Sequence, residues 1–171
     1  MKIIIVGFMG VGKTSVGKRL AEKLNFDFID TDYEIELSQD MPMSNIFQNY
    51  GEAYFRKLEN QTLKNVLNRN NIVISTGGGI ITDKDNYSIL KNEETVIFLD
   101  ASVETIINHL HNEINKRPLL YESENLRKKI EEAVKRVGAE NVFGFTFDWR
   151  KSQVDYAKAV DEYIQEVKEI T

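Results

Sequence analysis

The sequence has no cysteine among its 171 residues, only two prolines, and no long hydrophobic run. Without cysteine the chain forms neither disulfides nor cysteine-ligated zinc sites. This absence is typical of a reducing compartment, so we expect the cytoplasm. Because no apolar run approaches ~18 residues, we expect no transmembrane helix and no membrane partner. The first apolar stretch begins at residue 3, which leads us to expect no signal peptide.

Positive charge is also scarce, since 22 Lys and Arg stand against 27 Asp and Glu and leave a net charge of −5. With no long basic stretch, we expect no nucleic-acid partner. The length suits one domain over residues 1–171 with a sizeable core, and 42% hydrophobic residues are ordinary for a globular protein. No exposed apolar stripe is evident, so we expect a monomer.

The strongest motif is the segment IIIVGFMGVGKT at residues 3–14. It fills the pattern GxxxxGK[ST] after four apolar residues that predict a strand buried on both faces. Glycines let backbone N–H groups surround phosphate oxygens, and the helix expected from about Lys13 adds the positive end of its dipole. We expect Lys13 to reach the β- and γ-phosphates and Thr14 to ligate Mg²⁺. The predicted nucleotide-binding residues are Gly10, Val11, Gly12, Lys13, Thr14 and Ser15.

Apolar strand-like and amphipathic helix-like segments alternate along the chain, which predicts an α/β protein. We expect a three-layer P-loop fold, a five-stranded parallel sheet with helices on both faces. Ligands of such sheets bind at the carboxyl ends of the strands, where the P-loop, Asp30 and Gly77 to Gly79 would meet. The expected strands are residues 3–6, 26–29, 72–75, 95–99 and 142–147, and the main helices begin at about 13, 33, 52, 83, 102, 124 and 152. The expected helix caps are Ser44, Thr82, Ser102 and Ser152.

Asp30 and Asp32 lie two positions apart after the second strand. In extended backbone both side chains would point to one face. Beside a Mg-nucleotide, one carboxylate would lie near the metal and the other near an acceptor hydroxyl. The alternative is a solvated acidic loop in which Asp32 caps the next helix.

Arg56 and the run Gly77 to Gly79 are two further candidates. An arginine suits a substrate carboxylate or phosphate, but Arg56 could equally pair at the surface with Glu59, three positions on. Three consecutive glycines are costly unless the backbone must approach something closely. The alternative for them is a tight strand-to-helix turn.

Several segments in this order resemble the shikimate kinase family, from Met1 to about Leu120. They are VGFMGVGKT, FIDTD, the Ile46-Phe47 pair before Gly51-Glu52, FRKLE, VISTGGG and RPLL. The resemblance implies a nucleoside-monophosphate-kinase-like fold with a substrate-binding segment at about 31–61 and a mobile lid at about 112–123. It also implies ATP and shikimate as partners, with phosphorylation of the shikimate 3-hydroxyl.

The resemblance further implies a role for each matching residue. Thr14 and Asp30 would hold Mg²⁺, and Asp32 would bind the shikimate hydroxyls and assist deprotonation. Arg117 would close from the lid onto the transferring phosphate, so that Lys13, Asp32 and Arg117 form the expected catalytic set. Arg56 would pair with the shikimate carboxylate. The expected substrate-binding residues are Asp32, Arg56, Gly77, Gly78, Gly79, Phe47 and Phe55.

The sequence departs from the family pattern at three places. Family lids usually carry an arginine that packs on adenine about seven positions before the RPLL arginine, and this chain has Leu110 there. His109 or His111 is the candidate to stack instead; the alternative is that both are exposed at a helix end. The family's R-x-P-x-Y motif is missing, and Arg136 is our preferred second carboxylate ligand, with Arg150 and Lys151 as rivals. The segment VFGFTFDW, ending at Trp149, is unusually aromatic for a last strand.

Three rival functions are open at this stage. The nearest is another P-loop kinase acting on a different hydroxylated acid or on a nucleotide. A GTP-dependent switch would need [NT]KxD, but Asn115-Lys116-Arg117-Pro118 has proline at the aspartate position. A non-catalytic ATP-binding protein is disfavoured by the presence of Lys13, Thr14, Asp30, Asp32 and Arg56 together.

Overall fold

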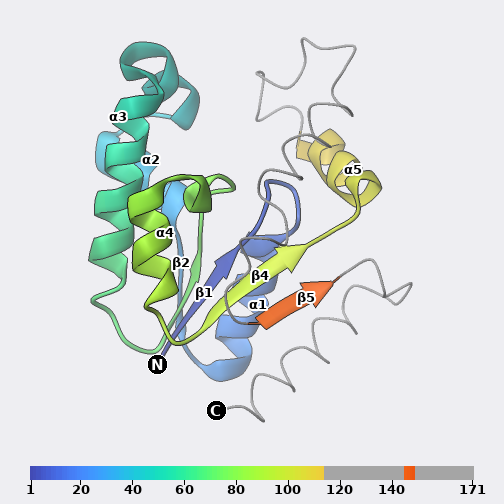
Figure 1. Ribbon diagram of the computed structural model, residues 1–171. Helices are drawn as coiled ribbons and strands as arrows, with labels where there is room; N and C mark the ends of the chain where they lie inside the picture. Colours follow the sequence, from blue (N-terminus) through green and yellow to red (C-terminus); the bar gives the residue numbers. More distant parts are fainter. Residues whose placement is uncertain (114–144, 149–171) are drawn as a thin grey trace.

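The computed structural model describes residues 1–113 and 145–148 (Figure 1). Strands and helices alternate through this part of the chain, as predicted. The elements are β1 (Lys2–Val6), α1 (Lys13–Leu24), β2 (Asp27–Asp30), α2 (Thr31–Gln39), α3 (Met43–Val66), β3 (Ile72–Ser75), the 3₁₀ turn η1 (Ile80–Thr82), α4 (Lys84–Lys91), β4 (Val96–Asp100), α5 (Val103–Glu113) and β5 (Phe145–Asp148).

The strands form one parallel sheet in the order β2-β3-β1-β4-β5 (Figure 1). The central strand β1 pairs through Ile4 with Ile74 of β3 and with Val96 of β4. A run of Ile and Val suits a strand that is covered on both faces. The predicted parallel sheet is therefore confirmed, and the P-loop leaves its central strand.

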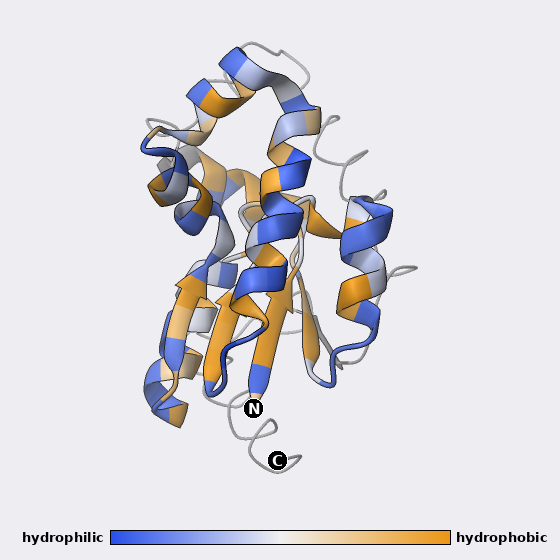
Figure 2. Ribbon diagram, turned by 90° about the vertical axis from the view of Figure 1, so that its left-hand side faces the viewer, coloured by the Kyte–Doolittle hydropathy of each residue, from blue (hydrophilic) through white to orange (hydrophobic). Residues whose placement is uncertain are grey.

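The two faces of the sheet are covered by different helices. Alternate residues of β1 point to opposite sides, so Ile3 and Ile5 belong to one core cluster and Ile4 and Val6 to the other. The first cluster includes residues of α1 and α5, and the second includes residues of α3 and α4. Figure 2 shows the hydrophobic strands between helices whose exposed sides are hydrophilic. This confirms the expected layers of helices on both faces.

The first helix is predicted correctly at both ends. α1 runs from Lys13 to Leu24, and Val16, Leu20 and Ala21 are buried at helical spacing. Asn25 ends the helix in the left-handed conformation, with φ of 56°. The helix N-terminus therefore begins immediately after the P-loop, where its backbone N–H groups face the loop.

The third helix is one element with a sharp kink. Gly51 has φ of 78° and ψ of 175° inside α3, a conformation that is open essentially to glycine alone. Both sides of the kink pack on α2, because Ile46 before it and Phe55 after it share a small cluster with Ile35. The kink thus sets α2 and the start of α3 apart as a unit over the end of the sheet, within the predicted substrate-binding segment (Figure 1).

Two of the predicted caps are wrong. Pro42 precedes α3 in place of the expected Ser44, and Asp83, not Thr82, caps α4 by accepting hydrogen bonds from the backbone of Asp85 and Asn86. Asp83 lies one position nearer the helix and is a stronger cap than threonine. The Ser102 cap is confirmed, because its Oγ accepts from the Thr105 backbone N–H at 3.1 Å.

The last strand differs from its expected bounds. Instead of residues 142–147, β5 covers Phe145–Asp148, and residues 142–144 and the expected Ser152 cap lie outside the described part. Among the helices of the described residues, none has both the length and the hydropathy to cross a membrane.

Candidate functional site

The phosphate-binding loop lies between β1 and α1, as predicted. Gly10 and Gly12 have φ values of 78° and 95°, which folds the loop back over the start of the helix. Lys13 is only 8% exposed, and its Nζ donates to the carbonyl oxygens of Gly7 at 2.8 Å and Phe8 at 2.9 Å. Its ammonium group therefore lies within the loop, in reach of a phosphate bound there.

Asp30 joins the second strand to the phosphate-binding loop. Its Oδ2 accepts a hydrogen bond from Thr14 Oγ1 at 2.7 Å, and its Oδ1 caps α2 by accepting from the backbone of Asp32 and Tyr33. The expected extended backbone over 30–32 is wrong, because the chain enters α2 at Thr31. The alternative of Asp32 as the cap is also wrong, since Asp30 is the residue that caps.

The Thr14–Asp30 pair fits a magnesium ion. Mg²⁺ prefers oxygen ligands and usually takes one or two protein groups together with water and substrate phosphates. Here a hydroxyl and a carboxylate lie side by side at the N-terminus of α1, next to the phosphate-binding loop. In residues 1–113 and 145–148, no group of three His, Cys, Asp or Glu could hold a metal by itself.

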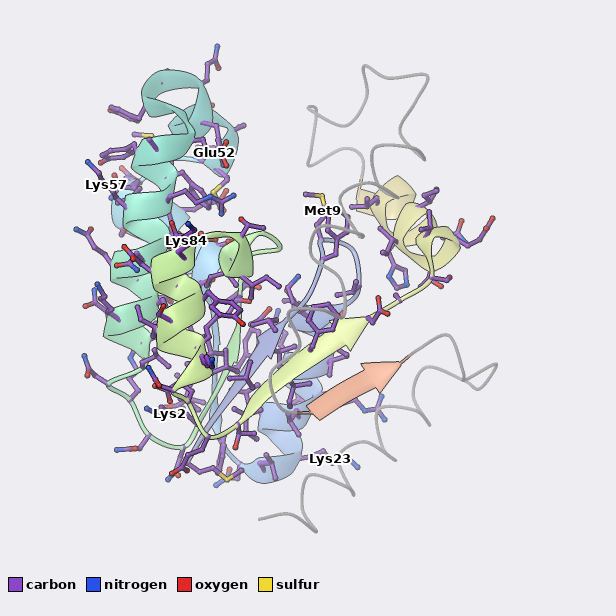
Figure 3. All side chains as sticks on the ribbon, in the orientation of Figure 1. Lys2, Met9, Lys23, Glu52, Lys57 and Lys84 are labelled. Atoms are coloured by element: carbon purple, nitrogen blue, oxygen red, sulfur yellow. The ribbon has the colours of Figure 1, made fainter. Side chains whose placement is uncertain are left out.

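The Gly77–Gly79 run is where the candidate residues meet. A Cβ atom on Gly77 would lie 2.7 Å from Asp32 Oδ1, and one on Gly78 would lie 2.7 Å from the backbone nitrogen of Met9 in the P-loop. Figure 3 labels Met9 in the loop that follows β1. These distances leave no room for side chains at either position. The close approach explains glycine at these positions, while the predicted role of the run in binding substrate stays a prediction.

Arg56 lies on the other side of the same glycines. Its Nη2 would be 3.0 Å from a Cβ atom on Gly79. Nη1 donates to Glu59 Oε2 at 2.8 Å, and Nη2 donates to Glu52 Oε1 at 3.2 Å. Partial burial would lower the pKa of Arg56, but the hydrogen bonds and charges of these glutamates outweigh it and raise the pKa above its ordinary value. The helix-neighbour pair with Glu59 is therefore present, and the predicted role of Arg56 as an anion ligand stays a prediction.

Sequence reasoning missed the importance of Glu59. Its side chain is buried, and its Oε1 has no hydrogen-bond partner among the described residues. Burial raises the pKa of the Glu59 carboxyl; the bond and charge of Arg56 partly offset this rise, and the charges of Asp32 and Asp83 add to it. The spacing of three between Arg56 and Glu59 in FRKLE was a visible sign of the pair, but not of its burial.

A buried asparagine extends this group to the fourth helix. Asn86 is fully buried; its Nδ2 donates to Glu59 Oε2 at 3.4 Å, and its Oδ1 accepts from Asn60 Nδ2 at 2.8 Å. The network therefore fixes Glu59, and through it Arg56, against α4. No motif in the sequence indicated Asn86, because its partners lie 26 and 27 residues away.

Phe47 and Phe55 pack on each other, with ring centroids 4.6 Å apart. Phe55 is 5% exposed and belongs to the cluster under α2, and its ring centroid lies 5.4 Å from Arg56 Cζ. Phe55 therefore packs against the arginine, and Phe47 packs on Phe55. The predicted contact of the two rings with a substrate stays a prediction.

Several predicted site residues lie outside the described residues. The expected lid at 112–123 overlaps the last two residues of α5, and the rest of it falls in the range 114–144. The side chain of His111 is also outside the described part. The residues concerned are Arg117, Arg136, Trp149, Arg150 and Lys151.

Comparisons with known proteins agree with one another. A profile of the shikimate kinase family matches residues 9–168. The chain is 47% identical over 116 residues to a shikimate kinase from Macrococcus caseolyticus, covering 68% of each chain, and 42% identical over 138 residues to one from Persephonella marina, covering 81% of this chain and 84% of that one. A solved structure of shikimate kinase from Acinetobacter baumannii in complex with shikimate superposes with a TM-score of 0.83 at 32% identity, covering 99% of this chain and 91% of that chain.

Proposed function

The chain belongs to the shikimate kinase family, and on this premise we propose that it transfers the γ-phosphoryl group of ATP to the 3-hydroxyl of shikimate. The products are shikimate 3-phosphate and ADP, in aromatic amino-acid biosynthesis. The fold is that of the P-loop small-molecule kinases, a parallel sheet with helices on both faces.

One observation carries the proposal, namely that the Gly77–Gly79 run borders the P-loop, Asp32 and Arg56 at the same time. Gly78 borders the P-loop at Met9, Gly77 borders the Asp32 carboxylate, and Gly79 borders the Arg56 guanidinium. Phosphoryl transfer consists mainly of placing donor and acceptor next to each other and stabilising the charge that develops. An acceptor held by Asp32 and Arg56 would lie beside a phosphate held by the P-loop.

The donor side is formed by Lys13, the loop amides and the N-terminus of α1. Lys13 would exchange its present bonds to the Gly7 and Phe8 carbonyls for bonds to phosphate oxygens. Thr14 and Asp30 would hold Mg²⁺ beside the loop. When bound, this ion would neutralise charge on the β- and γ-phosphates.

On the acceptor side, Arg56 would bind the carboxylate of shikimate. Each Nη of its planar guanidinium carries a second N–H that could donate to the carboxylate. Because Gly79 has no side chain, the space beside Nη1 and Nη2 is free of a Cβ atom. Glu59 and Glu52 hold the group in one orientation before substrate binds. Asp32 would accept a hydrogen bond from a shikimate hydroxyl and assist its deprotonation, with Gly77 to Gly79 forming the floor.

The proposal extends to finer features that the family resemblance implies. Arg117 closes onto the transferring phosphate from a lid at about 112–123, and Arg136 rather than Arg150 is the second carboxylate ligand. β5 completes a five-stranded sheet, and the enzyme is a cytoplasmic monomer. The lack of cysteine supports the compartment.

The test is an ADP-release assay with a panel of acceptors. We expect Mg²⁺- and ATP-dependent turnover with shikimate, and much slower or no turnover with quinate, gluconate and nucleoside monophosphates. Turnover that favours one of these other acceptors would assign the chain to a different P-loop small-molecule kinase.

A further inference from the structure

α5 contacts the phosphate-binding loop through a histidine. His109 Nδ1 lies 2.6 Å from the carbonyl oxygen of Gly10, 99 residues earlier in the chain. A carbonyl oxygen can only accept, so Nδ1 must carry the hydrogen. In the neutral ring, Nε2 is then the unprotonated nitrogen. The histidine is half-buried, at the start of the last turn of α5.

The packing around this bond presses the loop against α5. A Cβ atom on Gly10 would lie 3.1 Å from Leu110 Cγ and 3.3 Å from the Ile106 carbonyl oxygen. Leu110 and Ile106 are buried in one core cluster with Val11 of the loop. Leu110 occupies the position where shikimate kinases usually have an arginine that packs on adenine. In this chain the side chain at that position is buried in the core and packs beside the P-loop. His109 is likewise engaged with the loop.

The hydrogen bond acts on the orientation of one peptide group. The peptide bond is planar, so the Gly10 carbonyl and the Val11 N–H point in opposite directions within one plane. Holding the carbonyl toward α5 therefore directs the Val11 N–H away from α5, in the opposite direction within that plane. Within the described residues, this N–H makes a long bond of 3.4 Å to the Phe8 carbonyl inside the loop. The backbone of Gly10 can adopt many conformations, so the hydrogen bond from His109 reduces the conformational freedom that this peptide would otherwise have to lose when phosphate binds.

From this juxtaposition we propose that His109 is a positioning residue of the nucleotide site, which it serves by holding the Gly10–Val11 peptide in the orientation that binds phosphate. The proposal rests on the proposed function for the identity of the nucleotide. It assigns His109 a role through the loop, rather than direct stacking on adenine. Removing the Nδ1 donor lets the peptide rotate, so nucleotide binding weakens and shikimate binding does not.

The test compares three variants of the full chain. His109→Leu removes the donor, whereas His109→Asn keeps an N–H donor near the position of Nδ1. Asn108→Leu is the matched control, because Asn108 is exposed on the same helix. For His109→Leu we expect the KM for ATP and the Kd for ADP to rise about three- to tenfold, the effect of one hydrogen bond. The KM for shikimate stays within about twofold, His109→Asn recovers most of the loss, and the control behaves as wild type.

A spectroscopic measurement tests the bond without a substitution. Long-range ¹H–¹⁵N NMR of the wild-type protein at high pH, with the His109→Asn variant to identify the signal, should show neutral His109 as the Nδ1–H tautomer. This result also supports the proposal if His109→Leu fails to fold. A neutral Nε2–H tautomer would overturn it, and so would unchanged ADP binding in folded His109→Leu. Calorimetry measures ADP binding without any acceptor, so it tests the role of His109 independently of the reaction. A wild-type protein that binds ADP but fails to phosphorylate shikimate would refute the proposed function and leave the role of His109 intact.

Discussion

At the scale of single residues, Lys13 is the cation that the phosphate-binding loop encloses. Its ammonium should stabilise charge that develops on the β–γ bridge, so Lys13→Met should lower kcat by about 10²–10³-fold while the protein stays folded. Lys18→Met is the control, since Lys18 is exposed on the same helix and should tolerate the change. Turnover and circular dichroism are measured together. Near-normal turnover in a folded Lys13→Met protein would contradict the P-loop assignment.

Arg56 supplies a planar fork whose orientation two glutamates maintain. Arg56→Lys keeps the charge but loses bidentate geometry, so we expect the KM for shikimate to rise about ten- to hundredfold, with little change in the KM for ATP. Lys57→Ala, at the exposed neighbouring position, should change neither. Steady-state kinetics with each substrate varied in turn decides the matter. An unchanged shikimate KM would leave Arg56 with a structural role only.

The raised pKa of the Glu59 carboxyl should make the stability of the protein depend on pH. Burial raises the pKa of this carboxyl, an effect that Arg56 reduces and that the charges of Asp32 and Asp83 increase. The folded protein then retains this proton at a pH where the unfolded chain has lost it. Between the two pKa values, the contribution of Glu59 to the free energy of unfolding therefore falls as the pH rises.

Glu59→Gln removes this contribution. The free energy of unfolding of the variant, relative to wild type, should rise with pH through the window that begins at the ordinary glutamate pKa and ends at the raised one. Urea unfolding from about pH 4 to pH 8 measures the difference. Glu22→Gln, at an exposed position in α1, should show no such trend. A pH-independent difference for Glu59→Gln would show that the pKa is not raised.

At the scale of elements, the kink of α3 depends on the backbone of Gly51. No atom of the described residues lies within 4 Å of a Cβ atom placed there, so the obstacle to a side chain is the positive φ. Gly51→Ala should therefore destabilise the fold by about 1–3 kcal/mol and raise the KM for shikimate, because α2 and the start of α3 shift. Gln48→Ala, at an exposed position of the same helix, should change stability by less than about 0.5 kcal/mol. Equal stability of the two variants would show that the kink does not depend on glycine at position 51.

At the scale of the whole molecule, we expect the lid proposed at residues 112–123 to close over both substrates. Closure over bound ATP and shikimate would exclude water and protect residues 112–123. Proteolysis within this range should be rapid in the ligand-free protein and at least about tenfold slower with an ATP analogue and shikimate together. The cut site is identified by mass spectrometry. Equal cleavage rates with and without the ligands would refute lid closure.

The sequence by itself determined the features that depend on local spacing. The P-loop, the bounds of α1, the alternation of strands and helices, and the parallel sheet all follow from short-range rules of glycine geometry, apolar periodicity and crossover connections. FIDTD, FRKLE and VISTGGG marked Asp30, Arg56 and the three glycines as site candidates before any contact was known. Each of these motifs spans only a few residues, so its chemistry can be recognised without knowing the packing.

Only the tertiary structure decided how these pieces meet. Asp30 rather than Asp32 caps α2, Glu59 and Asn86 form a buried polar group behind Arg56, and His109 reaches Gly10 across 99 residues. The physical reason is that burial and long-range hydrogen bonds depend on which surfaces the packed layers bring together. A glutamate three positions after an arginine has the same local pattern on an exposed helix as in a core. Packing against α4 and the glycine loop determines which of the two it becomes.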